Sequence, residues 1–483
     1  MSLVATIRRD VALKFTGEVL SRALFLGFFF YLGRRMGSVD FGTLNLAIST
    51  AYILGVLFLD GGLNLPAIQL LVSEKHHRQV VASSVFTAKL LLYVPMCLVL
   101  WGVSRFLGGG TPAMSLLLIA SLYVLGTNLV EYLSAVTNAF HRMEIEAALK
   151  IFNRIAAVGL GLIALRFGHV APVLVALAAA TLISSMLALI AVRRQLVRVS
   201  LMFDWPLVKR LAWMGLPIAG TLVVGTIYLK WDLLVLSYFK ISKEQIGWYA
   251  GAFEIVEAFS ALPSLLGAAL FPLMVQLRDS NADAMDRLLN TTTKAVLLFA
   301  IPVAATVSLF SRHIIGIIYG SAYLPAATIL AVLIWCIVPM FIYFYLMFVN
   351  VASGHARQNL FAGTIALVVG MSANALLVPR MGYIGAAWAA LAANTSYALV
   401  ATWRVCQSFR HARLPRTVLQ VLAAGILMAL AGFYLPLPIG FQFIAGMAVF
   451  LAALLVTGAL SGDDLALMMR MIQMRTQPKV QEL

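Results

Sequence analysis

The feature that most constrains the fold is a series of long apolar stretches joined by short polar turns. A stretch of about 20 apolar residues crosses the hydrocarbon core of a bilayer as a helix, which satisfies its own backbone groups where no water is present. The chain contains fourteen such stretches, at 10–33, 41–72, 80–104, 113–140, 147–167, 170–192, 207–239, 244–277, 288–310, 325–352, 358–379, 382–403, 416–435 and 438–460. The sequence therefore predicts an all-α polytopic membrane protein with about 14 transmembrane helices.

Charged residues are few and mostly basic. The chain is 62% hydrophobic and 11% charged, with a formal net charge of +16, which is not the composition of a soluble domain. Lys and Arg gather at the ends of the apolar stretches, where they set orientation and meet anionic lipid, so the excess does not indicate nucleic-acid binding. Most of them lie on the same side as the N-terminus. We therefore expect an integral protein of the cytoplasmic (inner or plasma) membrane with both termini in the cytoplasm.

The connecting segments leave no room for a catalytic domain, since the longest are about 193–207 and 278–287. The three cysteines lie apart in apolar stretches, and none of the seven histidines pairs at a metal-binding spacing, so neither a metal nor a cofactor is expected. No phosphate-binding GxxxxGK(S/T) loop occurs, which excludes an ATP-driven pump within this chain. The sequence favours a protein that is not an enzyme and that works through charges inside the membrane.

The two halves of the chain resemble each other weakly. Gln245-Ile246-Gly247 in the second half corresponds to Asp40-Phe41-Gly42 in the first, and Asn350 corresponds to Asn138. Six spans per repeat predict two parallel lobes with a cavity between them near the midplane. The expected domains are an N-terminal six-helix lobe (1–194), a cytoplasmic basic linker (195–206), a C-terminal six-helix lobe (207–410), an additional helix pair (411–461) and a cytoplasmic tail (462–483).

Two motifs carry a resemblance to a known family. One is the turn from Glu244 to Ala252, which follows a stretch containing Trp231-Asp232, and the other is the NALLVPRMGYIGAA string from Asn374 to Ala387. With the span number and the repeat, they resemble the polysaccharide flippase family of the multidrug, oligosaccharidyl-lipid and polysaccharide exporter superfamily. The resemblance implies movement of a polyprenyl-diphosphate-linked oligosaccharide from the cytoplasmic to the outer leaflet by alternating access.

The implied setting includes membrane lipids, a polysaccharide polymerase and glycosyltransferases as possible partners, and H⁺ or Na⁺ as a possible coupling ion. Membrane potential is the other source of driving force. Two alternatives stay open. An ion-coupled drug exporter of the same superfamily has the same architecture, whereas a membrane enzyme of polysaccharide assembly is disfavoured by the absence of a sizeable outer loop.

Three charged residues fall inside the first apolar stretch. Lys14, Glu18 and Arg22 are spaced four residues apart, so on a helix they share one face. Lys and Arg bind phosphate well, and Glu18 would hold the two cations in position. We expect this face to bind the diphosphate headgroup, although a salt ladder without a ligand, or Lys14 extending to the membrane surface, would produce the same pattern.

Further candidates for the substrate site lie in the following stretches. Asp60 stands before Gly61-Gly62, where a broken helix lines either protein or a water-filled cavity, and it has Arg22 or Lys89 as a possible partner. Lys89 and Arg154 lie about two turns from the cytoplasmic end, where they either line the inner mouth or extend to the surface. Glu131 lies deeper and would balance one of them.

A second set of charges occupies 228–259. Lys230 and Asp232 are two residues apart and do not share a helix face, whereas Glu254 and Glu257 are three apart and do. Charges in a bilayer normally face protein or a wet cavity, because exposure to lipid costs roughly 3 kcal/mol or more. These four residues are candidates for ion coupling, with either glutamate serving Lys230. Charge balance between helices is the competing interpretation.

Overall fold

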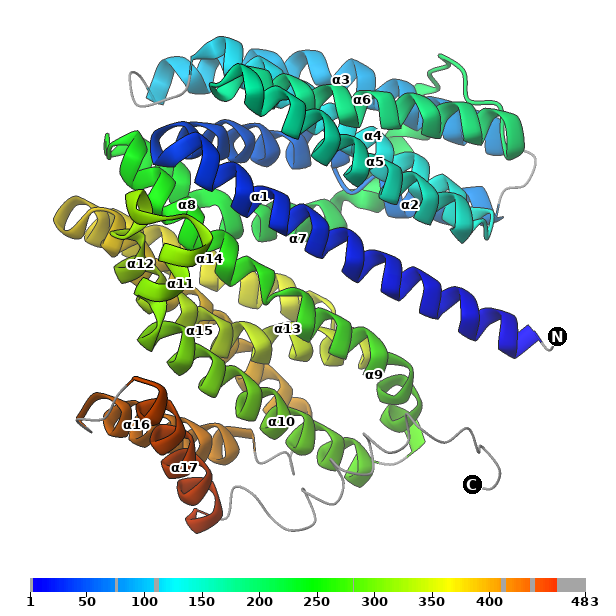
Figure 1. Cartoon of the computed structure of the whole chain (residues 1–483). Coiled ribbons are helices and arrows are strands. Elements are labelled where there is room, and N and C mark those ends of the chain that lie inside the picture. The colour runs from blue at the N-terminus through cyan, green and yellow to red at the C-terminus, as the bar shows by residue number, and fades with distance from the viewer. Residues whose placement is uncertain are drawn as a thin grey trace. The chain divides into compact units, whose positions relative to one another are not determined.

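The computed structural model describes residues 3–73, 77–107, 113–280, 282–409, 414–434 and 439–457, with side chains described from Ala23 onward in the first helix. Every regular element in these ranges is helical (Figure 1). The helices are α1 (Leu3–Gly55), α2 (Asn64–Ser73), α3 (Arg78–Leu107), α4 (Met114–Ala139), α5 (Met143–Ala164), α6 (Val170–Gln195), α7 (Trp205–Tyr238), α8 (Lys243–Ala258), α9 (Ala261–Ser280), α10 (Ala282–Leu309), α11 (Ser311–Ile318), α12 (Ala326–Leu333), α13 (Ile337–Ala352), α14 (Arg357–Met381), α15 (Tyr383–Ser408), α16 (Leu414–Tyr434) and α17 (Ile439–Val456).

Within the described residues, eleven helical segments are long and apolar enough to cross a membrane, and two shorter apolar helices follow at Val418–Met428 and Ile444–Val456. The all-α polytopic fold is thus confirmed, whereas the number of long segments is lower than the fourteen predicted. The first two predicted spans merge into one continuous segment, Ala23–Ser73. No loop separates them, because the chain turns by a kink at Gly37 alone, where φ is 79° and ψ is 169°. Glycine adopts such a conformation at little steric cost.

The chain forms two compact units. The first contains Met1–Ile255, Ile315–Ile329 and Ala366–Ala390, and the second contains Val256–Ile314, Leu330–Ile365 and Leu391–Leu483. In the first unit α4 packs along α6 and also against α1, and α5 packs against α6 (Figure 1). The buried faces of α4 and α6 are rich in small residues and Leu or Val, which let helices approach closely in a membrane.

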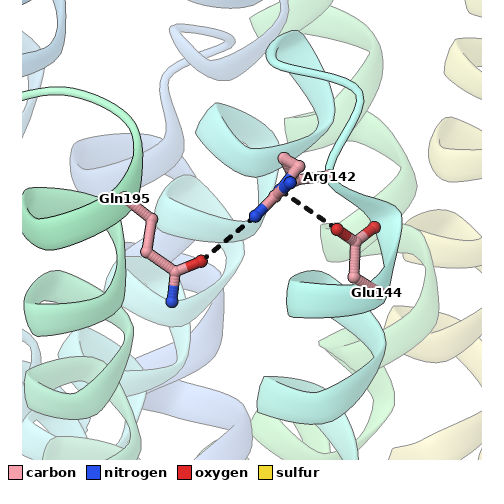
Figure 2. A network of polar contacts seen from close by, with 3 residues as sticks. All are labelled: Arg142, Glu144 and Gln195. Carbon is pink, nitrogen blue, oxygen red and sulfur yellow. Dashed lines mark hydrogen bonds and ion pairs between the residues drawn. The ribbon is translucent and has the colours of Figure 1, made fainter.

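A short polar network ties the beginning of α5 to the end of α6 (Figure 2). The Arg142 guanidinium pairs with Glu144 at 3.0 Å and donates to Gln195 at 3.4 Å. The Arg142 and Glu144 side chains are largely exposed, at 49% and 65%. Exposed pairs of this kind contribute little stability, so the network marks the surface of the bundle rather than a functional site.

Two glycines in the first unit allow an unusually close helix contact. A Cβ atom on Gly42 of α1 would overlap the backbone of Lys243 and Gly247, and one on Gly247 of α8 would overlap the carbonyl of Ser38. These glycines occupy equivalent places in the two weakly similar halves of the sequence. The backbones of α1 and α8 therefore meet directly at the positions that the repeat relates.

The second unit packs α9 against α13, and α10 against both α13 and α16. Its buried polar contacts are between side chain and backbone for the most part. Asn350 donates to the Asn359 side chain at 2.7 Å, and Tyr397 donates to the Asn359 carbonyl at 3.2 Å. The Arg278 guanidinium reaches the carbonyl of Ala352 at 3.5 Å. These bonds satisfy groups that would otherwise lack a partner in an apolar surrounding.

Candidate functional site

Asp232 lies at the centre of a buried cluster formed by three helices. Its Oδ2 accepts a hydrogen bond of 2.6 Å from the Tyr249 hydroxyl of α8, and its Oδ1 accepts one of 2.8 Å from Asn374 Nδ2 of α14. Asp232 is 8% exposed, and both Tyr249 and Asn374 are 1% exposed. Bonds from neutral donors to a carboxylate are short and strong, so this cluster fixes the relative positions of the three helices.

The cluster joins the two sequence motifs that first suggested a family. Tyr249 belongs to the Glu244–Ala252 turn, and Asn374 begins the Asn374–Ala387 string, 142 residues from Asp232. Sequence reasoning named Asp232 alone as a site candidate. Tyr249 and Asn374 belong to the two family motifs but were not predicted as site residues. No local pattern in either motif indicates that the two motifs contact each other.

Asn374 contributes a second feature of this cluster. Its Nδ2 also donates to the Gly370 carbonyl at 3.0 Å, while its Oδ1 is buried without a hydrogen-bond donor in the described part of the chain. An unpaired buried amide oxygen is uncommon, because a lost hydrogen bond costs about 1–3 kcal/mol. The cluster thus contains the Asp232 carboxylate and, on the neighbouring Asn374, an amide oxygen that receives no hydrogen bond from the described residues.

A second group of charges gathers in the first unit. The Glu131 carboxyl of α4 interacts electrostatically with Asp60, Lys89, Lys150 and Arg154. The predicted candidates Asp60, Lys89, Arg154 and Glu131 are thereby brought together, and Lys150 joins them. Lys150 was not among the predicted site residues, and it forms an i,i+4 pair with the buried Glu146 at 2.7 Å.

Lys89 is completely buried in this group. Its ammonium donates to the carbonyl of Leu59 at 2.5 Å and to Asn128 Oδ1 at 3.5 Å, and it lies 5.6 Å from the centroid of the Tyr132 ring. The interpretation that Lys89 extends to the membrane surface is therefore wrong. The physical reason is local, since the carbonyl of Leu59 lies in a π-helical turn, Val56–Asp60, and needs a donor that the side chain supplies.

The break predicted after Asp60 is present. Gly61 and Gly62 have φ of 48° and 69°, and a Cβ atom on Gly62 would overlap the backbone of Gly215 in α7. The Oδ1 atom of Asp60 is buried and has no hydrogen-bond partner among the side chains and backbone that the structure describes. The break thus places the Asp60 carboxylate next to a close backbone contact between two segments of the first unit.

Arg154 and Lys230 contact aromatic rings. The guanidinium of Arg154 lies 4.1 Å from the centroid of Phe25, and the ammonium of Lys230 lies 5.4 Å from that of Phe253. Both cations interact electrostatically with Tyr123 of α4, as does Glu131, which places Lys230 with the first-unit charges. Arg154 and Lys230 are half-buried and Glu131 is exposed, so these groups are accessible, in contrast to Lys89.

The remaining predicted candidates are two glutamates of α8, which the structure describes, and three residues of α1, whose side chains it does not describe. Glu254 and Glu257 are half-buried on α8, and Glu254 interacts electrostatically with Tyr319. The pairing of either glutamate with Lys230 stays a prediction. Residues 14, 18 and 22 lie within the helical span of α1, but their side chains are outside the described residues. No group of three or more His, Cys, Asp or Glu side chains that would hold a metal ion occurs in the described ranges.

Comparison with solved structures identifies the fold. A structure titled as the lipid II flippase MurJ in an inward closed conformation matches with a TM-score of 0.75 and 17% identity, over 92% of this chain and 98% of that one. An inward-facing MATE-family multidrug resistance transporter of the MOP superfamily matches with a TM-score of 0.59 and 15% identity, over 83% of this chain and 99% of that one. The eukaryotic MATE transporter AtDTX14 matches with a TM-score of 0.56 and 13% identity, over 84% and 98%.

The sequence comparisons give the family. None of the curated protein sequences matches this one. The profile described as "Polysaccharide biosynthesis protein" matches residues 7–278, which is more than half of the 483 residues and includes Asp60, Lys89, Arg154 and Asp232. The fold of the MOP transporters and this match agree with the resemblance inferred from the motifs. The chain therefore belongs to the polysaccharide biosynthesis protein family and has a fold like that of MurJ and the MATE transporters.

Proposed function

We propose that the protein is a flippase that moves a polyprenyl-diphosphate-linked oligosaccharide from the cytoplasmic to the outer leaflet by alternating access. The observation that supports this proposal is a group of four cations that lies with Asp60 and Glu131 among membrane-spanning helices in a member of the polysaccharide biosynthesis family. The four are Lys89, Lys150, Arg154 and Lys230. A diphosphate is the anionic part of such a substrate. Guanidinium and ammonium groups in a partly desolvated surrounding bind phosphate by charge-assisted hydrogen bonds.

In this proposal, the accessible cations contact the headgroup. Arg154 and Lys230 supply the charge, joined by Lys14 and Arg22 from the first helix, while Glu18, Asp60 and Glu131 hold these cations apart from one another. Lys89 acts differently, because it is completely buried and its ammonium donates to the Leu59 carbonyl. It positions the turn that carries Asp60 and does not touch the substrate.

Asp232 is proposed as the coupling carboxylate. Its bonds to Tyr249 and Asn374 join three helices, and the neighbouring Asn374 Oδ1 receives no hydrogen bond from the described residues. Oxygen atoms of this kind bind either a proton or a hard cation such as Na⁺. Binding of H⁺ or Na⁺ would alter the bonds between the helices, and thereby link an ion gradient to the position of α7. Glu254 and Glu257 of α8 are further candidates for this role.

The remaining features of the proposal follow the predicted topology. Fourteen spans result when the kinked segment Ala23–Ser73 is counted as two and the shorter α16 and α17 are added to the eleven long segments. This count gives two six-helix lobes and a C-terminal pair. Both termini then lie in the cytoplasm of a cell whose inner membrane holds the polymerase and glycosyltransferases of the same pathway. The protein needs neither cofactor nor metal in this scheme and forms no covalent intermediate with its substrate.

The test uses the purified protein in liposomes loaded with a labelled polyprenyl-diphosphate oligosaccharide in one leaflet. Wild type, Arg22→Ala and Arg154→Ala are compared with Arg194→Ala, which removes an exposed cation at the end of α6. We expect transfer by wild type and the control, and at least a tenfold slower transfer by the other two variants. Extrusion of a cationic dye under an ion gradient, without lipid transfer by wild type, would instead identify a drug exporter.

A further inference from the structure

A cavity of about 510 Å³ lies within the first unit, and no charged residue lines it. Four membrane-spanning helices form its walls. The lining residues are Thr50, Ile53 and Leu54 of α1, Val103 of α3, Trp231, Leu234, Val235 and Tyr238 of α7 with the adjoining Phe239, and Met371 and Ala375 of α14. None of them was singled out by the site prediction.

The walls of this cavity are unsuited to a polar ligand. Nearly all lining side chains are aliphatic or aromatic, and the hydroxyl of Thr50 already donates to the Leu46 carbonyl at 2.7 Å. A sugar would lose its hydrogen bonds to water here without replacing them, which is costly. A hydrocarbon chain loses nothing and gains burial of apolar surface.

The helices that line the cavity also carry exposed apolar side chains. Leu98 of α3 is 66% exposed and Leu376 of α14 is 62% exposed. In a membrane-spanning segment such faces meet lipid, since no part of the chain that the structure describes covers them. A ligand can therefore arrive from the bilayer itself, which restricts its chemistry to a membrane lipid.

The first charged residue that follows the lining positions along the sequence is basic in three of the four helices. The first charged residue beyond Val103 is Arg105, the first beyond Phe239 is Lys240, and the first beyond Ala375 is Arg380. The fourth helix, α1, differs because the charged residue nearest to its first lining residue, Thr50, on the N-terminal side is the acidic Asp40, ten residues away. Three cations at the ends of three lining helices complement an anionic phosphate attached to a long hydrocarbon chain.

We propose that this cavity binds the polyprenyl chain of the lipid-linked substrate, with the phosphate end toward Arg105, Lys240 and Arg380. The assignment to a polyprenyl chain rather than a phospholipid acyl chain rests on the proposed function. The site is also adjacent to the Asp232 cluster, because Trp231 precedes Asp232 and Ala375 follows Asn374. A chain in the cavity thus contacts the two helices that the Asp232–Asn374 bond connects.

The experiment is photo-crosslinking of the full-length purified protein in nanodiscs. The probe is a polyprenyl monophosphate with a diazirine on its chain, and labelled residues are mapped by mass spectrometry. We expect labels on residues 231–239 and 371–375. Ala375→Trp fills the cavity and should lower labelling at 231–239 at least tenfold. Leu376→Trp adds the same ring one residue later, on the exposed face of α14, and should leave labelling unchanged.

Competition separates the two sources of hydrocarbon. A tenfold excess of unlabelled polyprenyl monophosphate should remove the label, whereas the same excess of phosphatidylglycerol should not. Equal competition by both lipids would overturn the assignment to a polyprenyl chain. Persistent labelling of a correctly folded Ala375→Trp variant, or labels confined to other helices, would overturn the site itself.

The same probe distinguishes this inference from the proposed function. Labelling in the cavity without transfer of lipid-linked oligosaccharide in liposomes would leave the polyprenyl site standing and refute the flippase. Transfer without labelling in the cavity would leave the flippase standing and refute the site. Both measurements use wild-type protein from one preparation.

Discussion

At the residue scale, two buried charges, Asp232 and Lys89, are each held by two specific hydrogen bonds. Asp232 receives two neutral donors from other helices, and Lys89 donates to a backbone carbonyl and a side-chain amide. Neither partner set is an ion pair. A buried charge held in this way remains fixed in place, because loss of one partner leaves the charge without compensation.

Lys89→Met tests the role of the buried lysine. Methionine has a similar length but cannot donate to Leu59, so the π-helical turn loses the partner of one carbonyl. We expect a loss of about 1–3 kcal/mol of stability and a lower melting temperature, measured by intrinsic fluorescence in detergent. Lys209→Met alters an exposed lysine of α7 and should change stability by less than about 0.5 kcal/mol. Equal melting temperatures for both variants would contradict the positioning role.

Tyr249→Phe removes the shortest bond to Asp232 while keeping the ring. Hydrogen bonds to charged groups are worth about 1.5–3 kcal/mol, and the variant should lose a comparable amount in the same melting experiment. Tyr383→Phe is the control, since its half-exposed ring packs on Trp248 through its apolar surface. A stability for Tyr249→Phe as high as that of this control would show that Asn374 alone holds the carboxylate.

At the scale of elements, close contacts between helices depend on glycine. Gly42 and Gly247 bring α1 and α8 together at the positions that the internal repeat relates, and Gly62 and Gly215 bring the broken segment against α7. Each contact joins backbone to backbone, so no side chain can move aside to admit a methyl group. Helices in membranes use small residues for such approaches because lipid provides no hydrophobic force between them.

Gly247→Ala should separate the two helices at this contact. The added methyl group overlaps the Ser38 carbonyl, and overpacking of this kind costs about 1–3 kcal/mol. The variant should therefore melt at a lower temperature than wild type when intrinsic fluorescence is followed in detergent. Gly225→Ala is the matched control in α7, where a methyl group meets open space. A melting temperature of Gly247→Ala equal to that of this control would mean that the contact tolerates a side chain.

At the scale of the whole molecule, the net charge of the proposed cargo governs the energetics of transport. A diphosphate headgroup with two negative charges moves outward, down a potential that is negative inside. For full charge transfer this contributes about 5 kcal/mol per 100 mV, if the charges of the protein do not compensate. Under that condition the electric field would be sufficient to drive the proposed cycle even without an ion gradient.

Sealed vesicles with an imposed potassium diffusion potential test this energetic argument. Outward transfer of the labelled lipid should accelerate as the interior becomes more negative, and a potential of opposite sign should slow it. Asp232→Asn measured alongside reveals any separate dependence on a proton or sodium gradient. Transfer that is indifferent to potential would exclude field-driven movement and leave the ion gradient as the driving force.

The helices and their membrane setting follow from the apolar runs alone, because a run of sufficient length forms a spanning helix whatever its neighbours are. The break at Gly61-Gly62 and, through two motifs, the family also follow from the amino-acid sequence. Which polar and charged side chains meet depends instead on how distant helices pack. Asp232 and Asn374 are 142 residues apart, and Lys89 binds a carbonyl 30 residues away, in a π-helical turn that no local pattern announces. The physical reason is that helix pairing in lipid depends on small residues and on single hydrogen bonds between distant helices, whereas hydropathy specifies only that each helix lies in the membrane.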